Sequence, residues 1–236
     1  MPMQLPFFFE ANIPEAGNFF MSEESSKHIV QVLRMKQGQE IKITNGKGEL
    51  LTSFITISNK KKTEVAIRNR LSLPKSSQKV SIAISPLKNN NRFEWFLEKA
   101  TEIGVSEIIP LICNRTERNS MKMERMNNIL VSAMLQSRQA WIPELIEPTK
   151  FSELITNRSY HQKFIAYCNE TGKKTLKEFH NKDGSQIILI GPEGDFTQNE
   201  INIAIQNNYI PVSLGETRLR TETAGIVAAV LLMNNF

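Results

Sequence analysis

The chain has 236 residues and carries 29 Lys and Arg against 24 Asp and Glu, a formal net charge of +5. Hydrophobic residues make up 40% and charged residues 22%, which is typical of a folded globular protein, and no apolar run approaches the roughly 20 residues that span a bilayer. Two cysteines, Cys113 and Cys168, are too few for a disulfide framework or a four-ligand zinc site, and no secretory signal is evident. We therefore expect a cytoplasmic protein with reduced thiols, no bound metal and no membrane partner. Its basic excess permits an acidic partner such as nucleic acid without requiring one.

The first 73 residues are predicted to form a small β-rich domain. Polar and apolar residues alternate in several short stretches, and Asn45-Gly46 is a strong hairpin signal between two of them. One short helix interrupts the strands, with Ser22 as its N-cap. Several short strands and one helix in this length suggest a small barrel. The predicted strands are 40–44, 50–57 and 63–73.

Three consecutive lysines, Lys60, Lys61 and Lys62, lie in a predicted turn of this segment. Residues 1–73 hold 10 basic and 7 acidic residues, a net of +3, so the segment is more basic per residue than the rest. Two interpretations of the lysine run stay open. It is either a solvated hairpin turn or an edge that contacts phosphates.

Beyond a linker at residues 74–78, short apolar strands alternate with helical periodicities. Gly104 is placed to end the first helix, and Thr197 with Glu200 forms a capping box that begins a later one. This alternation predicts an α/β domain with a largely parallel sheet over residues 74–236. The predicted strands are 80–84, 108–112, 163–168, 186–190 and 210–214, and the final, nearly all-apolar helix is 223–233.

Two loops of this segment are candidates for chemistry, since open parallel sheets bind ligands at the carboxyl ends of their strands. The first, residues 191–196, is glycine-rich, and taken alone it is better explained as an ordinary turn with a helix cap. The second, residues 214–224, holds two arginines and two glutamates between an apolar strand and an apolar helix. Buried charges are costly unless paired or used, so this loop is either a structural ion-pair network or a functional site. No phosphate loop, dinucleotide fingerprint or nucleophile elbow is present.

The order and spacing of several motifs resemble those of the RsmE family of bacterial ribosomal RNA uridine methyltransferases, in the SPOUT superfamily. The resemblance covers nearly the whole chain. Each motif is weak alone, and it is their succession that is specific. The motifs are residues 28–35, 98–105, 115–118, 136–137 with Pro143, 190–194, 214–215 and 219–224.

The resemblance implies an α/β fold class in which a PUA-like RNA-binding β-barrel (residues 1–73) precedes a SPOUT methyltransferase domain with a deep trefoil knot (residues 74–236). It implies S-adenosyl-L-methionine as the cofactor and methylation of N3 of a uridine in small-subunit (16S) ribosomal RNA, within an assembled or nearly assembled particle. It also implies a homodimer whose active sites lie beside the subunit interface.

Residue roles follow from the matching motifs. Arg220 is predicted to stabilise the negative charge that spreads over the uracil when N3 loses its proton. Glu222 either orients Arg220 or assists proton removal, and a structural salt bridge is the alternative. The predicted cofactor-binding residues are Ile190, Gly191, Pro192, Glu193, Gly194, Leu214, Gly215, Leu219, Arg220, Thr221, Thr223 and Ala224. The predicted RNA contacts, each with a plain surface role as its alternative, are His28, Arg34, Lys36, Lys60, Lys61, Lys62 and Arg138.

The chain departs from the family pattern in three places. Asp195 stands where a second glycine is frequent, and residues 136–139 read Gln-Ser-Arg-Gln instead of Gln-Ser-Gly-Arg. An arginine frequent near the N-terminus is absent from residues 4–8. Two other functions stay open on sequence alone. One is a non-catalytic RNA-binding protein that kept the fold, and the other is a SPOUT methyltransferase acting on another RNA or ring position.

Overall fold

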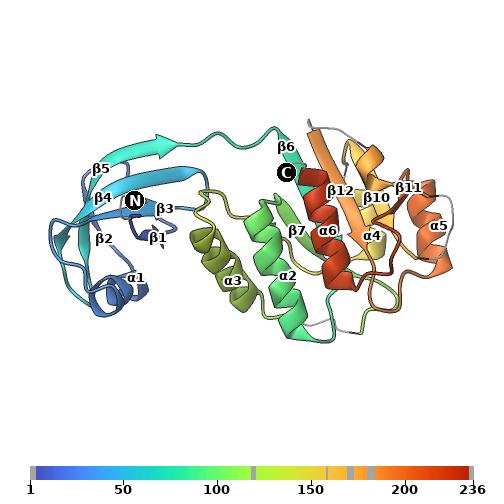
Figure 1. The fold of residues 1–236 in the computed structure, drawn as a ribbon, viewed down its shortest axis with the longest axis horizontal. Coiled ribbons are helices and arrows are strands. Elements are labelled where there is room, and N and C mark those ends of the chain that lie inside the picture. Colours follow the sequence, from blue (N-terminus) through green and yellow to red (C-terminus); the bar gives the residue numbers. More distant parts are fainter. Residues whose placement is uncertain (1–3, 118–120, 158, 169–172, 180–183, 234–236) are drawn as a thin grey trace. The chain divides into compact units, whose positions relative to one another are not determined.

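The computed structural model describes residues 4–117, 121–157, 159–168, 173–179 and 184–233. The chain divides into two compact units, which are described separately (Figure 1). Unit 1 comprises residues 1–75 and 134–142, and unit 2 comprises residues 76–133 and 143–236. Among the described residues, no helix combines the length and apolar character that crossing a membrane requires.

Unit 1 is built on a five-stranded sheet with the order β1-β3-β4-β5-β2. Only the β1–β3 pair is parallel, and the hairpin predicted at Asn45-Gly46 joins β3 to β4. Alternate residues such as Ile41, Ile43 and Ile55 are completely buried, so the period-2 pattern that predicts the strands also forms the core. The strands are β1 (Phe7–Phe9), β2 (Asn18–Phe20), β3 (Glu40–Thr44), β4 (Glu49–Ile57) and β5 (Glu64–Ser72).

The predicted short helix of unit 1 is confirmed. Helix α1 (Glu23–Lys27) begins after Ser22, whose hydroxyl oxygen accepts a hydrogen bond from the Ser25 backbone N–H at 3.3 Å. It continues into one turn of π-helix, η1 (His28–Val32), which buries Ile29 completely against the sheet core.

A segment from the middle of the chain, residues 134–142, belongs to unit 1, whereas the sequence pattern assigned it to the region 74–236. The Gly48 N–H donates to the Ala140 carbonyl at 2.9 Å, and the Ile142 N–H donates to the Gly46 carbonyl at 3.0 Å. Gly48 has a φ of +89°, and the Trp141 ring fills the space where a Cβ would stand. These contacts join residues far apart in the chain, so no local periodicity signals them.

Unit 2 contains an eight-stranded sheet in which every recorded strand pair is parallel, which confirms the predicted α/β class. The strand order is β11-β13-β10-β12-β6-β7-β8, with β9 beside β7. The knot that the resemblance implies stays a prediction. The strands are β6 (Gln78–Ile84), β7 (Glu107–Ile112), β8 (Glu144–Leu145), β9 (Thr149–Lys150), β10 (Gln162–Ala166), β11 (Lys174–Thr175), β12 (Gly184–Ile190) and β13 (Ile210–Ser213).

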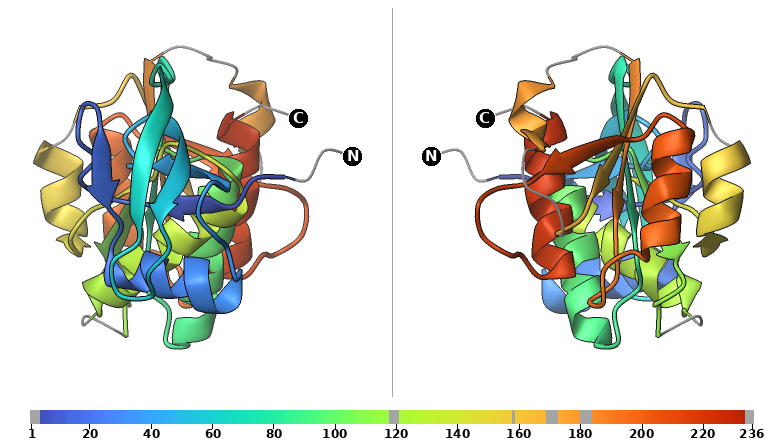
Figure 2. Two further views of the ribbon diagram at one scale, coloured as in Figure 1. Left: turned by 90° about the vertical axis from the view of Figure 1, so that its left-hand side faces the viewer. Right: turned by 90° about the vertical axis from the view of Figure 1, so that its right-hand side faces the viewer.

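Helices cover both faces of this sheet. Figure 2 shows α2 and α6 on one face and α4 and α5 on the other. Gly104, with a φ of +93°, ends α2, and both halves of the capping box of Thr197 and Glu200 are formed at the start of α5, as predicted. The helical segments are α2 (Asn90–Ile103), α3 (Met123–Gln136), α4 (Phe151–Asn157), η2 (Leu176–Glu178), α5 (Gln198–Gln206) and α6 (Thr221–Met233).

Helix α6 begins two residues earlier than its apolar run predicts. The Ala224 N–H donates to the Arg220 carbonyl at 2.7 Å, which brings Thr221 and Glu222 into the first helical turn. A carboxylate near a helix N-terminus is favoured by the helix dipole. The charged end of the second candidate loop is therefore part of a packed helix.

Glu107, at the start of β7, gives the fold a predictable pH dependence. Burial raises the pKa of its carboxyl, but hydrogen bonds from Lys79 Nζ (3.1 Å) and the Tyr160 hydroxyl (2.9 Å) outweigh burial and hold the pKa below its ordinary value of 4.5. A lowered folded-state pKa stabilises the protein above the unfolded-state value, and this contribution is lost as the pH falls through the folded-state pKa. We expect Glu107→Gln to lower the free energy of unfolding at pH 7 by about 1–3 kcal/mol. Urea unfolding should show the gap between variant and wild type narrowing below the carboxyl's ordinary pKa, and a gap that widens there would contradict the assignment.

Candidate active site

A cavity of about 700 Å³ opens at the carboxyl ends of β10, β12 and β13 in unit 2. These three strands are neighbours in the sheet. Each lining segment begins at the last residues of one strand and continues into the loop after it: residues 166–168, part of 190–195 and 212–221. Arg92 of α2, Lys173 and Ala224 of α6 complete the lining. The cavity therefore lies at the carboxyl ends of the strands, where open parallel sheets typically bind ligands.

The first candidate loop, residues 191–196, forms the wall that follows β12. A Cβ on Gly191 would stand 3.1 Å from the Phe196 ring, so the loop folds back tightly on itself there. Arg115 braces the loop from outside, since its Nη1 donates to the Gly194 carbonyl at 2.6 Å. Gly194 itself is not among the lining residues.

The structure shows why Asp195 can replace the second glycine that is frequent in the family. Its φ is +62°, the left-handed conformation that glycine adopts freely and that Asp tolerates better than most residues. Its carboxylate accepts hydrogen bonds from the backbone N–H groups of Cys168 (2.9 Å) and Phe196 (2.8 Å). The side chain thus ties the end of β10 to the loop after β12, a link that glycine lacks.

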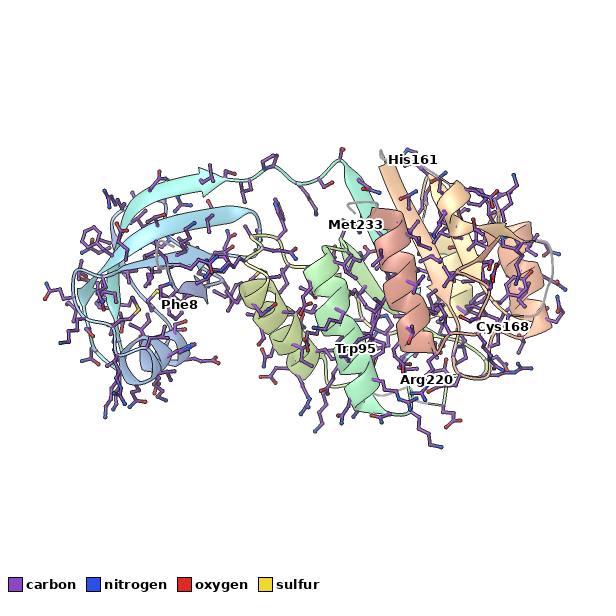
Figure 3. All side chains as sticks on the ribbon, viewed as in Figure 1. Phe8, Trp95, His161, Cys168, Arg220 and Met233 are labelled. Atoms are coloured by element: carbon purple, nitrogen blue, oxygen red, sulfur yellow. The ribbon has the colours of Figure 1, made fainter. Side chains whose placement is uncertain are left out.

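The second candidate loop, residues 214–224, lines the cavity with all of its residues except Glu222 and Thr223. Gly215 has a φ of +150° and open space around the position of a Cβ, and the Ser213 hydroxyl donates to its carbonyl at 2.9 Å. Arg220 is exposed and lines the cavity at the N-terminal end of α6. Figure 3 shows Arg220 at this end of the helix, while His161 lies at the opposite edge of the sheet.

Glu222 lies behind the cavity wall. Its side chain is 8% exposed, and its Oε1 is 3.7 Å from Nε of Arg92 on α2. Its Oε2 is buried without a hydrogen-bond partner among the described residues. The ion pair recorded for Glu222 is therefore with Arg92 and not with Arg220.

Most of the predicted cofactor-binding residues come together around the cavity. Ten of the twelve line it, and the two that do not are Gly194 and Thr223. Sequence reasoning missed the lining residues outside the two candidate loops other than Ile190, which are Arg92, Ala166, Tyr167, Cys168, Lys173, Val212 and Ser213. No motif marks them, although residues that directly follow a predicted strand at 163–168 were a usable signal for Tyr167 and Cys168.

All seven predicted RNA contacts lie in unit 1, and all are exposed. Arg34 and Arg138 have positive φ values of +53° and +57°, so Arg138 holds the conformation expected of the glycine in the family's Gln-Ser-Gly-Arg motif. Lys62 Nζ lies 4.0 Å from the ring centroid of Phe20. Arg118, the last residue of one family motif, lies outside the described residues.

The cavity's lining fits a ligand with apolar and charged parts. Ile190, Val212, Leu214 and Leu219 offer apolar surface for a purine, and Glu193, Asp195 and Glu216 offer carboxylates that complement a sulfonium or an ammonium group. Arginine and lysine side chains supply donors for anionic groups. The residues present therefore fit S-adenosylmethionine.

Comparisons with known proteins show the family to which this chain belongs. A family model described as an RNA methyltransferase domain matches residues 74–233, and one described as an RNA methyltransferase PUA domain matches residues 22–68. A ribosomal RNA small subunit methyltransferase E of Rickettsia conorii is 29% identical, covering 94% of this chain and 91% of that protein. A crystal structure described as a probable rRNA methyltransferase of Porphyromonas gingivalis is 36% identical with a TM-score of 0.89, covering 95% of each chain. A methyltransferase structure from Legionella pneumophila, in complex with the bound cofactor SAM, is 29% identical with a TM-score of 0.88, covering 98% of each chain.

The chain thus combines a unit with a parallel α/β sheet, which has a cavity at the carboxyl ends of its strands, and a small β-rich unit. The matched family model spans well over half of the chain. The chain therefore belongs to this family of RNA methyltransferases, and the resemblance to RsmE proteins is confirmed.

Proposed function

We propose that this chain is an S-adenosylmethionine-dependent methyltransferase of small-subunit (16S) ribosomal RNA, acting on N3 of a uridine. The observation that carries the proposal is the convergence of both candidate loops on one cavity of about 700 Å³ at the carboxyl ends of β10, β12 and β13. The names of the relatives and the SAM complex of the Legionella neighbour support the same activity.

In this proposal, the two loops bind the cofactor and Arg220 stabilises the charge that develops during the reaction. When bound, S-adenosylmethionine supplies an activated methyl group. The loops at 190–195 and 212–221 hold the ligand in one shape, which turns the reaction into one between positioned groups. Arg220 faces the cavity and stabilises the negative charge that develops on the uracil carbonyl oxygens when N3 loses its proton. Glu222 does not line the cavity, which favours a positioning role for it.

Unit 1 is proposed as the RNA-binding part. It matches a PUA domain of RNA methyltransferases and carries exposed basic side chains that include the Lys60–Lys62 run. Phosphate contacts of this kind fix the position of an RNA without reading its sequence. The target uridine then enters the cavity extruded from its stack.

We further propose that the enzyme is a cytoplasmic homodimer that acts on an assembled or nearly assembled particle. Trp95 of α2 supports the dimer, because it is 43% exposed and large aromatic side chains are enriched at protein interfaces. Trp95 and the cavity-lining Arg92 belong to the same helix, so an interface there would adjoin the active site.

The proposed function predicts a defined nucleotide change. Small-subunit RNA from cells lacking this chain should lose one N3-methyluridine, detected by mass spectrometry of nuclease fragments. The purified chain with S-adenosylmethionine should restore that nucleotide in particles or RNA from those cells. Cofactor binding by calorimetry with no restored methylation at any position would support a non-catalytic RNA-binding protein. A restored methyl group at another position would change the substrate assignment and leave the enzyme class intact.

A further inference from the structure

Arg92 is a cavity-lining residue that no sequence motif singles out. It lies in the first turn of α2, and its side chain, which is 40% exposed, lines the cavity. The contact recorded for its guanidinium among the described residues is the 3.7 Å approach of Nε to Glu222 Oε1. At this distance the two groups form an ion pair but are too far apart for a hydrogen bond. The N–H donors of the guanidinium therefore remain available to a ligand.

The buried carboxylate of Glu222 needs compensating interactions from its neighbours. A carboxylate this deeply buried is costly, and one of its two oxygens has no partner in the described part of the chain. The N-terminal end of α6 offsets part of that cost, and Arg92 supplies the nearby positive charge. Since Arg92 lines the cavity and Glu222 does not, the carboxylate stands behind the arginine as seen from the cavity.

The packing of the two helices sets this arrangement. Helix α6 can approach α2 closely because Gly225, one turn after Glu222, has no Cβ. A Cβ at this position would clash with the buried Phe96 of α2. The pair Arg92–Glu222 therefore joins two helices that pack in close contact. Because Nε is the atom that approaches Glu222, the two Nη groups of the planar guanidinium are left as a fork that matches a carboxylate or a phosphate.

We propose that Arg92 is an anion-binding residue of the active site and that Glu222 is the positioning residue that orients it. This inference rests on the proposed function, which offers two anionic groups of the same hydrogen-bonding chemistry. One is the carboxylate of S-adenosylmethionine, and the other is a phosphate of the RNA next to the target uridine.

The two sources are separated with paired ligands. Calorimetry of Arg92→Ala with S-adenosylmethionine and with 5′-methylthioadenosine, which lacks the carboxylate, reports on the cofactor. Steady-state methylation of RNA reports on the phosphate. Because the lost contact is a hydrogen bond between charged groups, we expect either the affinity for S-adenosylmethionine to fall or the KM for RNA to rise by about tenfold to a hundredfold. Loss confined to S-adenosylmethionine assigns the carboxylate, and a raised KM for RNA with an unchanged cofactor affinity assigns the phosphate.

Arg125→Ala is the matched control, because Arg125 also pairs with a glutamate of α2, Glu94, and lies outside the cavity lining. It should leave all three constants unchanged. Arg92→Lys keeps the positive charge but lacks the planar guanidinium. Its loss of affinity should therefore be smaller than that of Arg92→Ala but still measurable. If Arg92→Ala matches wild type in every constant, or weakens both small ligands equally, the anion-binding role is wrong. A wild-type chain that binds no cofactor and methylates no RNA overturns the proposed function, and this inference with it.

Glu222→Gln tests the positioning role, since it keeps the shape of the side chain and removes its charge. We expect the same ligand-specific loss as in Arg92→Ala, smaller in size, with kcat affected less than the binding constant. The double variant should be no worse than Arg92→Ala alone, because residues that act through one another are not additive. Additive losses, or a change in melting temperature with normal binding, would make Glu222 a purely structural residue.

Discussion

Arg220→Ala is expected to lower the turnover number on the order of a hundredfold or more, by analogy with the loss of one oxyanion-hole donor. Arg220 is exposed to the cavity and has no ion pair recorded among the described residues, so its guanidinium remains available to the substrate. An interaction made mainly in the transition state lowers turnover when removed and leaves binding nearly intact. Single-turnover methylation and cofactor calorimetry measure the two effects separately.

Arg220→Lys provides the graded comparison, because it keeps the positive charge and loses the planar fork. It should be impaired, though less than the alanine variant. Should Arg220→Ala instead lose cofactor affinity by the same factor as turnover, Arg220 would be a cofactor-binding residue and not the group that stabilises the reacting uracil.

Gly225→Ala is expected to destabilise unit 2, and Gly225→Leu is expected to destabilise it more. A Cβ at residue 225 would lie 2.7 Å from Phe96 Cε2 and 2.8 Å from Ile84 Cδ1, and both side chains are completely buried. Helix propensity alone predicts the opposite sign for alanine, a gain of about 1 kcal/mol. Overpacking typically costs about 1–3 kcal/mol, so the leucine variant should lose at least that much.

Thermal and urea unfolding measure this effect, with Val227→Leu as the control on a less buried position of α6. That control should stay close to wild type. A Gly225→Ala variant that is more stable than wild type would show that α6 and α2 can separate without loss. The fixed geometry inferred for Arg92 and Glu222 would then be wrong as well.

The parts of the fold that local patterns encode were predictable. The apolar runs before residues 85 and 191 become β6 and β12, and the capping box of Thr197 and Glu200 begins α5 as expected. Period-2 alternation likewise predicts β3 to β5. In each case the signal and the structure involve the same few consecutive residues.

The features that sequence reasoning missed depend on contacts between distant segments. Residues 134–142 join unit 1 through backbone hydrogen bonds to Gly46 and Gly48, which no periodicity reports. Arg92 becomes part of the site only because α6 packs on α2. The earlier start of α6 follows from one backbone hydrogen bond at Arg220, in a stretch whose charged residues masked the helical pattern.

The three segments that enclose the cavity follow three different strands, and the last of them precedes the final helix of the chain. A piece of unit 2 that ends before residue 212 lacks one of these segments, so the complete cavity requires all three strands to be in place. In the finished protein, each bound ligand molecule opposes opening of the whole unit, with a stabilisation that grows as the logarithm of ligand concentration. Amide exchange in β6, at the centre of the sheet and away from the cavity, should therefore slow when the cofactor is added.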